Sequence, residues 1–245
     1  MRAFAGAWTL PEGGLQIIAG PTYATADAAF DNDGDLAIPV SYNKLLLKAY
    51  VQYGLWDRLT LFADPEFAIA HETPAIGKKS EAKDVAFGGG ARFRLTDAIG
   101  TLSLEASGKT AGAFNLSVSS NGVSGSQGEV RLLYGSNFSL SDRDAFLDVQ
   151  VGHRWVSGGR PNEVPIDVTL GWHYAPKWIL MLQSFNIVSG SARAPYSYYR
   201  SHKLEFSAVY NFSEKYGVQF GAYTSPAGQN ALQERGVAVS LWINL

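Results

Sequence analysis

The chain of 245 residues contains no cysteine, which excludes zinc–thiolate centres and disulfide bridges. Charge is also scarce, since 17% of the residues are charged and the formal net charge is -2. Without a basic excess, or lysine and arginine runs interleaved with aromatics, no nucleic-acid partner is expected. The 46% of hydrophobic residues and the 26 glycines fit one all-β domain over residues 1–245.

Long hydrophobic runs are missing as well. The longest runs, such as Trp178 to Leu182, have the length of a strand. A membrane helix needs roughly 18 continuous apolar residues, and no stretch approaches that length. If this chain crosses a membrane, strands must cross it.

The sequence has many segments in which apolar residues occupy every second position. In the last nine residues, Val237, Val239, Leu241, Ile243 and Leu245 fall on one face of a strand that ends with the chain. Such a strand needs an apolar surface along its whole length, and similar segments of about ten residues recur along the chain. The pattern predicts a transmembrane β-barrel.

The connections between these segments are tight and long in turn. The tight ones are expected at residues 55–58, 96–100, 141–145, 175–177 and 212–216, and the long ones at 25–41, 71–83, 111–127, 157–165, 188–201 and 224–233. This spacing predicts an all-β, 12-stranded antiparallel barrel of up-and-down topology, closed by pairing of the last strand with residues 15–24. Tight turns of bacterial outer-membrane barrels are periplasmic, so both termini and an N-terminal segment, residues 1–14, are expected in the periplasm.

Aromatic residues gather beside the tight turns and predict a girdle at the headgroup level of the outer membrane. The expected lipid contacts are phospholipid and lipopolysaccharide. The segment around Trp178 to Asn186 stays ambiguous, because both of its faces begin apolar. The girdle candidates are Tyr53, Trp56, Phe138, Phe146, Trp172, Tyr174, Trp178, Tyr210, Phe212, Tyr216 and Trp242.

The opposite, inward face carries the charges. Register from the tight turns predicts that Lys48 lies opposite Asp64 and Glu66, and that Arg92 lies near Asp64 and Glu105. These ladders either neutralise a wet wall or form a selective eyelet for a charged or sugar-like solute. The candidate lumen and selectivity residues are Lys44, Lys48, Asp64, Glu66, Arg92, Arg94, Glu105, Arg131, Asp148, Arg154, Asp167 and His173.

The same reasoning places Arg154 level with Asp167, and Asp148 level with His173. An Asp–His pair is half of a hydrolytic triad, but barrel hydrolases place His and Ser two apart on one strand, and no His-x-Ser occurs here. Catalytic residues are therefore not expected.

Two loop motifs suggest ligands. The acidic run that begins at Asp31 resembles half of a calcium loop, but its twelfth position is Tyr42 instead of a carboxylate, so neither a metal nor a cofactor is predicted. Tyr196, Tyr198 and Tyr199 fit either saccharide stacking or an outer aromatic girdle. The Ser- and Gly-rich residues 115–127 fit either an exposed tip or an inward-folded constriction.

Five motifs carry a resemblance to a known family. The chain resembles the XagA proteins of proteobacterial outer membranes and is loosely similar to aromatic-compound porins of the phenol-degradation type. The first resemblance implies a link with surface attachment and exopolysaccharide clusters and transfers no catalytic residues. The motifs are residues 6–13 (GAWTLPEG), 51–55 (VQYGL), 183–186 (QSFN), 201–204 (SHKL) and 230–236 (NALQERG).

Three functions are compatible with these features. The first is a passive, porin-like channel for small polar or saccharide-like solutes in the bacterial outer membrane. The second is an accessory of exopolysaccharide export or surface attachment, and the third a lipid-modifying enzyme. The charged inward face favours the channel.

Overall fold

The computed structural model describes residues 6–74, 80–110, 125–191, 194 and 196–245. In these ranges the chain forms fifteen strands and no helix that could span a membrane. The strands are β1 (Leu15–Phe30), β2 (Leu36–Trp56), β3 (Leu59–Ala63), β4 (Glu66–Pro74), β5 (Ser80–Ala86), β6 (Gly88–Thr96), β7 (Thr101–Lys109), β8 (Gln127–Leu140), β9 (Arg143–Val156), β10 (Glu163–Ala175), β11 (Trp178–Ser189), β12 (Arg200–Asn211), β13 (Tyr216–Gln229), β14 (Ala231–Leu232) and β15 (Arg235–Asn244).

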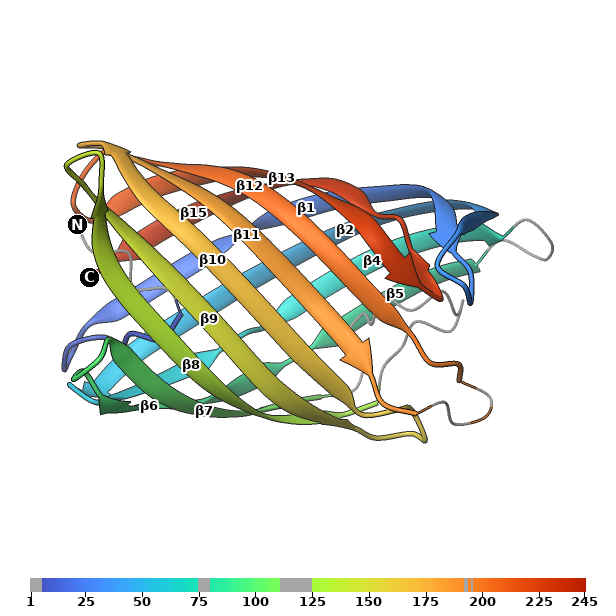
Figure 1. Ribbon diagram of the computed structural model, residues 1–245, viewed down its shortest axis with the longest axis horizontal. Helices are drawn as coiled ribbons and strands as arrows, with labels where there is room; N and C mark the ends of the chain where they lie inside the picture. Colours follow the sequence, from blue (N-terminus) through green and yellow to red (C-terminus); the bar gives the residue numbers. More distant parts are fainter. Residues whose placement is uncertain (1–5, 75–79, 111–124, 192–193, 195) are drawn as a thin grey trace.

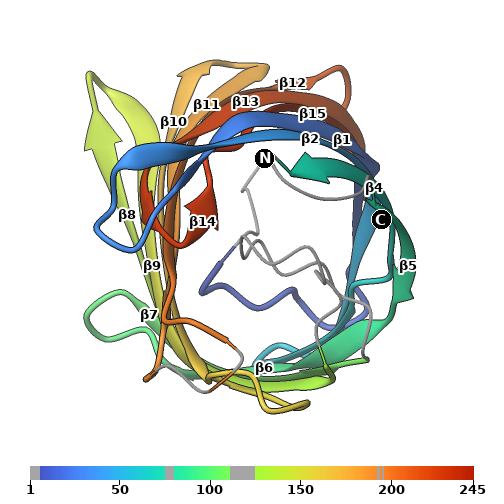
Figure 2. The same cartoon turned by 90° about the vertical axis from the view of Figure 1, so that its right-hand side faces the viewer.

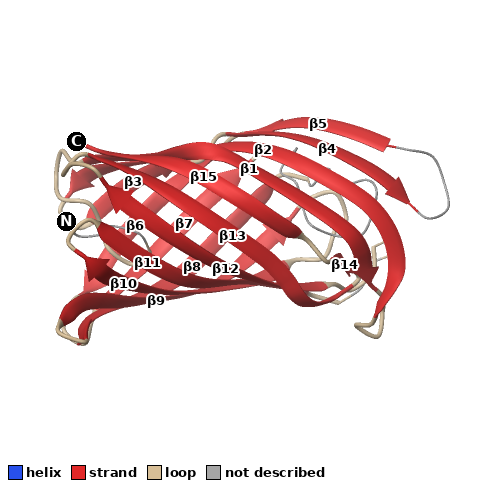
Figure 3. Ribbon diagram, turned by 90° about the horizontal axis from the view of Figure 1, so that it is seen from above, coloured by secondary structure: helices blue, strands red, loops and turns tan. Residues whose placement is uncertain are grey.

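The strands close into the predicted 12-stranded antiparallel barrel, with tilted strands and both termini at one end (Figures 1 and 3). Strand β3 continues into β4, β5 continues into β6, and β14 pairs only with the far end of β1. Strand β1 pairs with both β2 and β15, with Ile17 opposite Ile243. The predicted closure by the last strand is confirmed.

All five predicted tight turns are present. In the two-residue turn between β8 and β9, Ser141 and Asp142 both adopt positive φ, at 51° and 57°. Two consecutive residues at positive φ match the type I′ geometry that suits the twist of a hairpin. We call the barrel end with these turns and the termini the tight-turn end, and the opposite one the long-loop end.

Several predicted long loops are wrong, because the strands run on. Strands β1 and β2 leave only residues 31–35 between them, and β13 continues to Gln229. A membrane-crossing strand needs about 9–11 residues, so these hairpins project past that length while their backbones keep pairing. Of the candidate constriction, residues 115–127, the part from 115 to 124 lies outside the described residues.

One break in the wall follows from a proline. Pro65 separates β3 from β4 and has no N–H to donate to the ladder. Its carbonyl oxygen still accepts a hydrogen bond from the Ala49 nitrogen at 3.1 Å, so β3 and β4 together form one interrupted barrel strand. The neighbouring barrel strand, formed by β5 and β6, is interrupted at Phe87, whose backbone nitrogen donates to the Thr110 hydroxyl at 2.9 Å.

The alternation of faces is largely as predicted. Outward residues such as Trp56, Leu132 and Phe206 are 59%, 50% and 56% exposed. The girdle prediction is wrong for Phe146 and Trp242, which are buried inside the barrel at 4% and 5% exposure. Nearness to a turn does not override strand periodicity, which aims both side chains inward.

Candidate functional site

The N-terminal segment lies inside the barrel. Residues 6–14 cross the interior at the tight-turn end, where Figure 2 shows the N-terminal trace running between the walls. The Ala7 backbone nitrogen donates to Asp148 Oδ2 at 2.8 Å, and the Ala7 carbonyl oxygen accepts from Ser103 Oγ at 2.5 Å. These bonds fix one side of the segment to β9 and β7.

The other side is held by β2, β3 and β6. The Leu10 nitrogen donates to Thr60 Oγ1 at 2.8 Å, and Thr9 Oγ1 donates to the Asp57 carbonyl at 2.7 Å. Arg92 Nη1 donates to the Trp8 carbonyl at 3.2 Å. Hydrogen bonds from several strands therefore hold the segment against the wall. No periodic pattern in the sequence predicts this position.

Two wall glycines make room for this segment. A methyl group at Gly54 would lie 2.0 Å from the Pro11 carbonyl oxygen, and one at Gly135 would lie 2.7 Å from the Trp8 ring. Both approaches are far inside van der Waals contact, so any larger residue would push the segment away. The inward faces of β2 and β8 are shaped to receive it.

An apolar cluster packs beside the segment. Trp8 meets Phe146 edge to face, with ring centroids 5.8 Å apart and planes at 87°. The cluster resolves the ambiguous strand β11, since Ile179 and Met181 face inward and are each 3% exposed. Its members are Trp8, Ile18, Phe146, Ile179, Met181, Val209 and Trp242.

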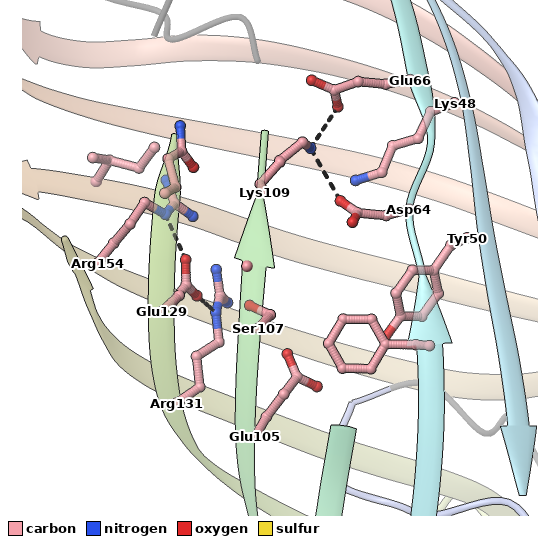
Figure 4. Close-up of a pocket in the computed structure, with 14 residues that line it drawn as sticks. Lys48, Tyr50, Asp64, Glu66, Glu105, Ser107, Lys109, Glu129, Arg131 and Arg154 are labelled. Atoms are coloured by element: carbon pink, nitrogen blue, oxygen red, sulfur yellow. Dashed lines mark hydrogen bonds and ion pairs between the residues drawn. The ribbon is translucent and has the colours of Figure 1, made fainter. Parts of the chain in front are cut away.

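Charged side chains line the rest of the lumen. Between the described residues it contains cavities of about 260 and 380 Å³. Glu105 and Tyr50 are among the residues that line the smaller cavity. Figure 4 shows charged side chains that point into this cavity from several strands. Both cavities are lined by Lys48, Glu66, Arg131, Arg154 and Ile187.

Most of these charges are paired across strands. Lys109 Nζ lies between Asp64, at 3.0 Å, and Glu66, at 2.8 Å (Figure 4). Arg131 and Arg154 share the carboxylate of Glu129. Charge-assisted bonds of this kind hold side chains in fixed positions on the wall of the cavity.

Both arginines also reach β10. Arg131 donates to Asp167 and Arg154 to Glu163, the latter at 2.7 Å. With Glu129 they form one chain of alternating sign that runs from β8 to β10.

Glu234 anchors the cavity at the long-loop end. This residue lies between β14 and β15, is 1% exposed, and binds Lys44 Nζ at 2.9 Å and Lys203 Nζ at 2.8 Å. Burial alone would raise the pKa of its carboxyl group, but the two ammonium groups outweigh burial and lower the pKa to about 2. The carboxylate thus neutralises lysines of two separate strands.

Part of the wall between β10 and β15 is held together by uncharged polar side chains. Gln183 donates to Thr169 at 3.3 Å and accepts from Ser207 at 3.2 Å. Gln219 bonds both Ser207, at 3.1 Å, and the Trp242 indole N–H, at 2.9 Å. Amides and hydroxyls thus satisfy one another from β10 to β15, where the other half of the wall uses ion pairs.

The predicted register holds on one side of the barrel and fails on the other. Lys48 is the ladder partner of Glu66, and Arg92 that of Glu105, which it binds at 2.7 Å. On its other side Arg92 lies opposite Thr60 instead of near Asp64. Across β9 and β10, however, Asp167 lies opposite Gln150 and Asp148 opposite Thr169. The assumed loop of residues 157–165 was too long, because β10 already begins at Glu163, and this error shifted the predicted pairs.

The structure brings eight of the twelve candidates to the cavity walls. Arg92 and Asp148 are buried instead and hold the N-terminal segment. Arg94 lies at the tight-turn end, where it donates to the Asp57 carbonyl at 2.9 Å, and His173 lies two residues before β10 ends. The eight are Lys44, Lys48, Asp64, Glu66, Glu105, Arg131, Arg154 and Asp167.

Tyr196, Tyr198 and Tyr199 each contact another residue of the chain. The Tyr196 ring lies 4.9 Å from the Arg160 guanidinium carbon, and the Tyr199 hydroxyl donates to Glu163. The Tyr198 carbonyl accepts from Asn230 at 2.8 Å. These contacts tie the loop to its neighbours at the long-loop end.

The predicted Asp–His pair is wrong. Asp148 accepts from the Ala7 nitrogen and from Gln150, and the described residues include no bond between it and His173. The other histidines contact Asn186, Glu81 and the Trp155 ring, and none of them contacts a serine. Three or more metal-ligating side chains are not gathered anywhere in the described ranges.

Sequence reasoning missed Glu163, Glu234 and the placement of the N-terminal segment. Glu163 lies in the predicted loop 157–165, and Glu234 lies between the predicted loop 224–233 and the last alternating segment. In neither place does the two-residue period of a strand give a facing direction. The only sequence signal for the inserted segment was small residues, Gly54 and Gly135, on the inward face of otherwise bulky strands.

Comparisons with known proteins agree with the barrel. No protein-family model and no curated protein sequence matches the chain. An outer-membrane channel from Pseudomonas putida F1 superimposes over 100% of both chains, with a TM-score of 0.71 and 15% identity.

Two autotransporter barrels are also similar. The translocator domain of NalP from Neisseria meningitidis has a TM-score of 0.61 and 10% identity, covering 94% of this chain and 88% of that one. The transport unit of AIDA-I from Escherichia coli has a TM-score of 0.55 and 7% identity, covering 94% and 89%. At such identities the likeness concerns the fold alone.

Proposed function

We propose that this protein is a passive channel of the bacterial outer membrane for small polar or saccharide-like solutes. The observation that carries the proposal is the hollow, charged lumen, with cavities of about 260 and 380 Å³ inside a barrel whose outer surface is apolar. Water and polar solutes are stabilised by such a wall, whereas lipid is not.

The exterior supports the membrane location. Leu45, Phe93, Leu182 and Val237 are 39%, 45%, 54% and 56% exposed, and in water such a band would be costly. We propose that phospholipid and lipopolysaccharide cover it, with the tight-turn end in the periplasm.

The N-terminal segment defines how the channel would work. A solute that crosses the barrel must pass beside residues 6–14 or displace them, because they lie across the lumen. The hydrogen-bonding amides and hydroxyls of β10 to β13 suit solutes rich in hydroxyl groups, which supports a saccharide-like class. We propose no catalytic step, since no nucleophile and base meet among the described residues.

Proteoliposome swelling tests the proposal. Liposomes with the refolded protein should swell in L-arabinose faster than empty liposomes, and planar bilayers should show stable current steps. Neither swelling nor current from correctly folded barrels would overturn the channel.

Cysteine labelling tests the orientation, because the natural chain has no cysteine to interfere. Asp33→Cys, in the turn between β1 and β2, should react with a membrane-impermeant maleimide in intact cells. Glu214→Cys, in the tight turn between β12 and β13, should react only after the cells are opened. The reverse pattern would contradict the proposed orientation.

A further inference from the structure

The larger cavity is lined by two charged side chains of opposite sign that make no ion pair within 4.0 Å among the described residues. They are Lys48 on β2 and Glu205 on β12, strands separated by β1, β15 and β13 in the wall. All other lysine, arginine, aspartate and glutamate side chains that line this cavity make ion pairs among the described residues. An unpaired charge facing a cavity is free to bind a solute.

Lys48 is left over because its natural partners are taken. It lies opposite Glu66 in the ladder, but the Glu66 carboxylate binds Lys109 at 2.8 Å. Asp64, the other nearby carboxylate, also binds Lys109, at 3.0 Å. No carboxylate in the described residues lies within 4.0 Å of the Lys48 ammonium, which points into both cavities.

Glu205 makes no ion pair among the described residues, because the nearby lysine already binds another carboxylate. Its neighbour Lys203 binds Glu234 at 2.8 Å and lies 4.5 Å from the centroid of the Tyr223 ring. Gly221 leaves space for the carboxylate, since a methyl group there would lie 2.6 Å from Glu205 Oε1. Burial without a hydrogen-bonded partner disfavours a charged carboxylate, so a bound ammonium group would stabilise it.

The wall of the same cavity has an apolar part. Leu46, Phe185 and Ile187 line it together with the two unpaired charges. Its volume of about 380 Å³ lies within the range of small-molecule sites, roughly 300–1,000 Å³. An ammonium, a carboxylate and an apolar side chain on one small solute would each meet a complementary surface.

We infer that the larger cavity binds and passes zwitterionic solutes with an apolar side chain, that is, apolar amino acids or the shortest peptides. Lys48 takes the solute carboxylate, Glu205 takes its ammonium group, and Leu46, Phe185 and Ile187 contact the side chain. This inference rests on the proposed channel and names one solute class for it.

Swelling assays with three solutes of similar size test the inference. L-leucine carries both charges, N-acetyl-L-leucinamide has the same side chain without charge, and L-arabinose reports general channel activity. The variants are Lys48→Met and Glu205→Gln, and the matched control is Lys177→Met in the exposed turn between β10 and β11.

The wild type should pass L-leucine faster than N-acetyl-L-leucinamide. Each lumen variant should slow L-leucine by about twofold to fivefold, the effect of losing one solvent-screened ion pair, and should change the L-arabinose rate less. Equal rates for leucine and its amide, or variants that leave their ratio unchanged, would overturn the zwitterion site alone. No swelling with any of the three solutes would overturn the channel itself.

Discussion

The two ends of the lumen use opposite chemistry. At the tight-turn end, Trp8 packs on Phe146, and Trp242 lies in the same apolar cluster. Toward the long-loop end, Arg131 and Arg154 line cavities and exchange ion pairs with carboxylates of neighbouring strands. One end is filled and the other is hollow.

This difference teaches that strand number alone does not decide whether a barrel is open. The same wall is packed where its inward residues are apolar and small enough to admit the N-terminal segment. It is open where long charged side chains form ion pairs along the wall and do not fill the centre of the lumen. Closure and selectivity therefore belong to separate parts of the lumen.

The largest expected effect is at the hollow end. Glu234→Gln leaves the ammonium groups of Lys44 and Lys203 without their shared carboxylate. Removing one partner of a buried pair costs about 3–5 kcal/mol, so the free energy of unfolding should fall by that order. Urea unfolding of the refolded barrel measures it, with Glu214→Gln in an exposed turn as control; equal stability of the two variants would contradict the anchoring role.

Acid should remove the same contribution. The pKa of Glu234 is lowered from 4.5 to about 2 in the folded barrel, so its contribution is complete above pH 4.5 and is lost as the pH falls toward 2. Unfolding measured over this interval should show wild type converging on Glu234→Gln. Parallel curves for the two proteins would show that the two lysines do not lower the pKa of Glu234.

A smaller effect is expected at the filled end. Trp8→Ala removes the edge-to-face contact with Phe146, worth about 0.5–1.5 kcal/mol, and should raise the frequency of high-conductance events about twofold to tenfold. Trp56→Ala is the control, because that ring is 59% exposed on the outside. Identical event frequencies in both variants would mean that Trp8 does not hold the segment.

The smallest effect should be on ion selectivity. Lys109→Met leaves Asp64 and Glu66 without their cation and makes the cavity wall one charge more negative. The reversal potential in a salt gradient should shift toward cation selectivity, and Lys177→Met outside the lumen should leave it unchanged. A shift toward anions would contradict the placement of this ion pair on the solute path.

The sequence predicted the wall well, and its contents poorly, for a physical reason. The period of two along a strand determines which side chains face inward, and Lys48, Asp64 and Arg131, which it predicts to face inward, line a cavity. Residues 6–14 have no such period, and their position depends on hydrogen bonds to Asp148, Ser103 and Thr60, far away in the chain.

Register across loops was equally inaccessible. Arg154 pairs with Glu163 because the connection after β9 is short, and the sequence alone did not reveal its length. Glu234 reaches Lys44 from outside any strand that crosses the wall. Both carboxylates are held by tertiary contacts that local patterns do not encode.

Single-channel conductance with and without the N-terminal segment tests the central claim most directly. The barrel lacking residues 2–12 should fold with the same strands and carry a larger and steadier current than the full chain, because nothing else in the described lumen crosses the tight-turn end. Equal conductance of the two proteins would show that the segment does not narrow the path, and would contradict a channel constricted at one end and selective at the other.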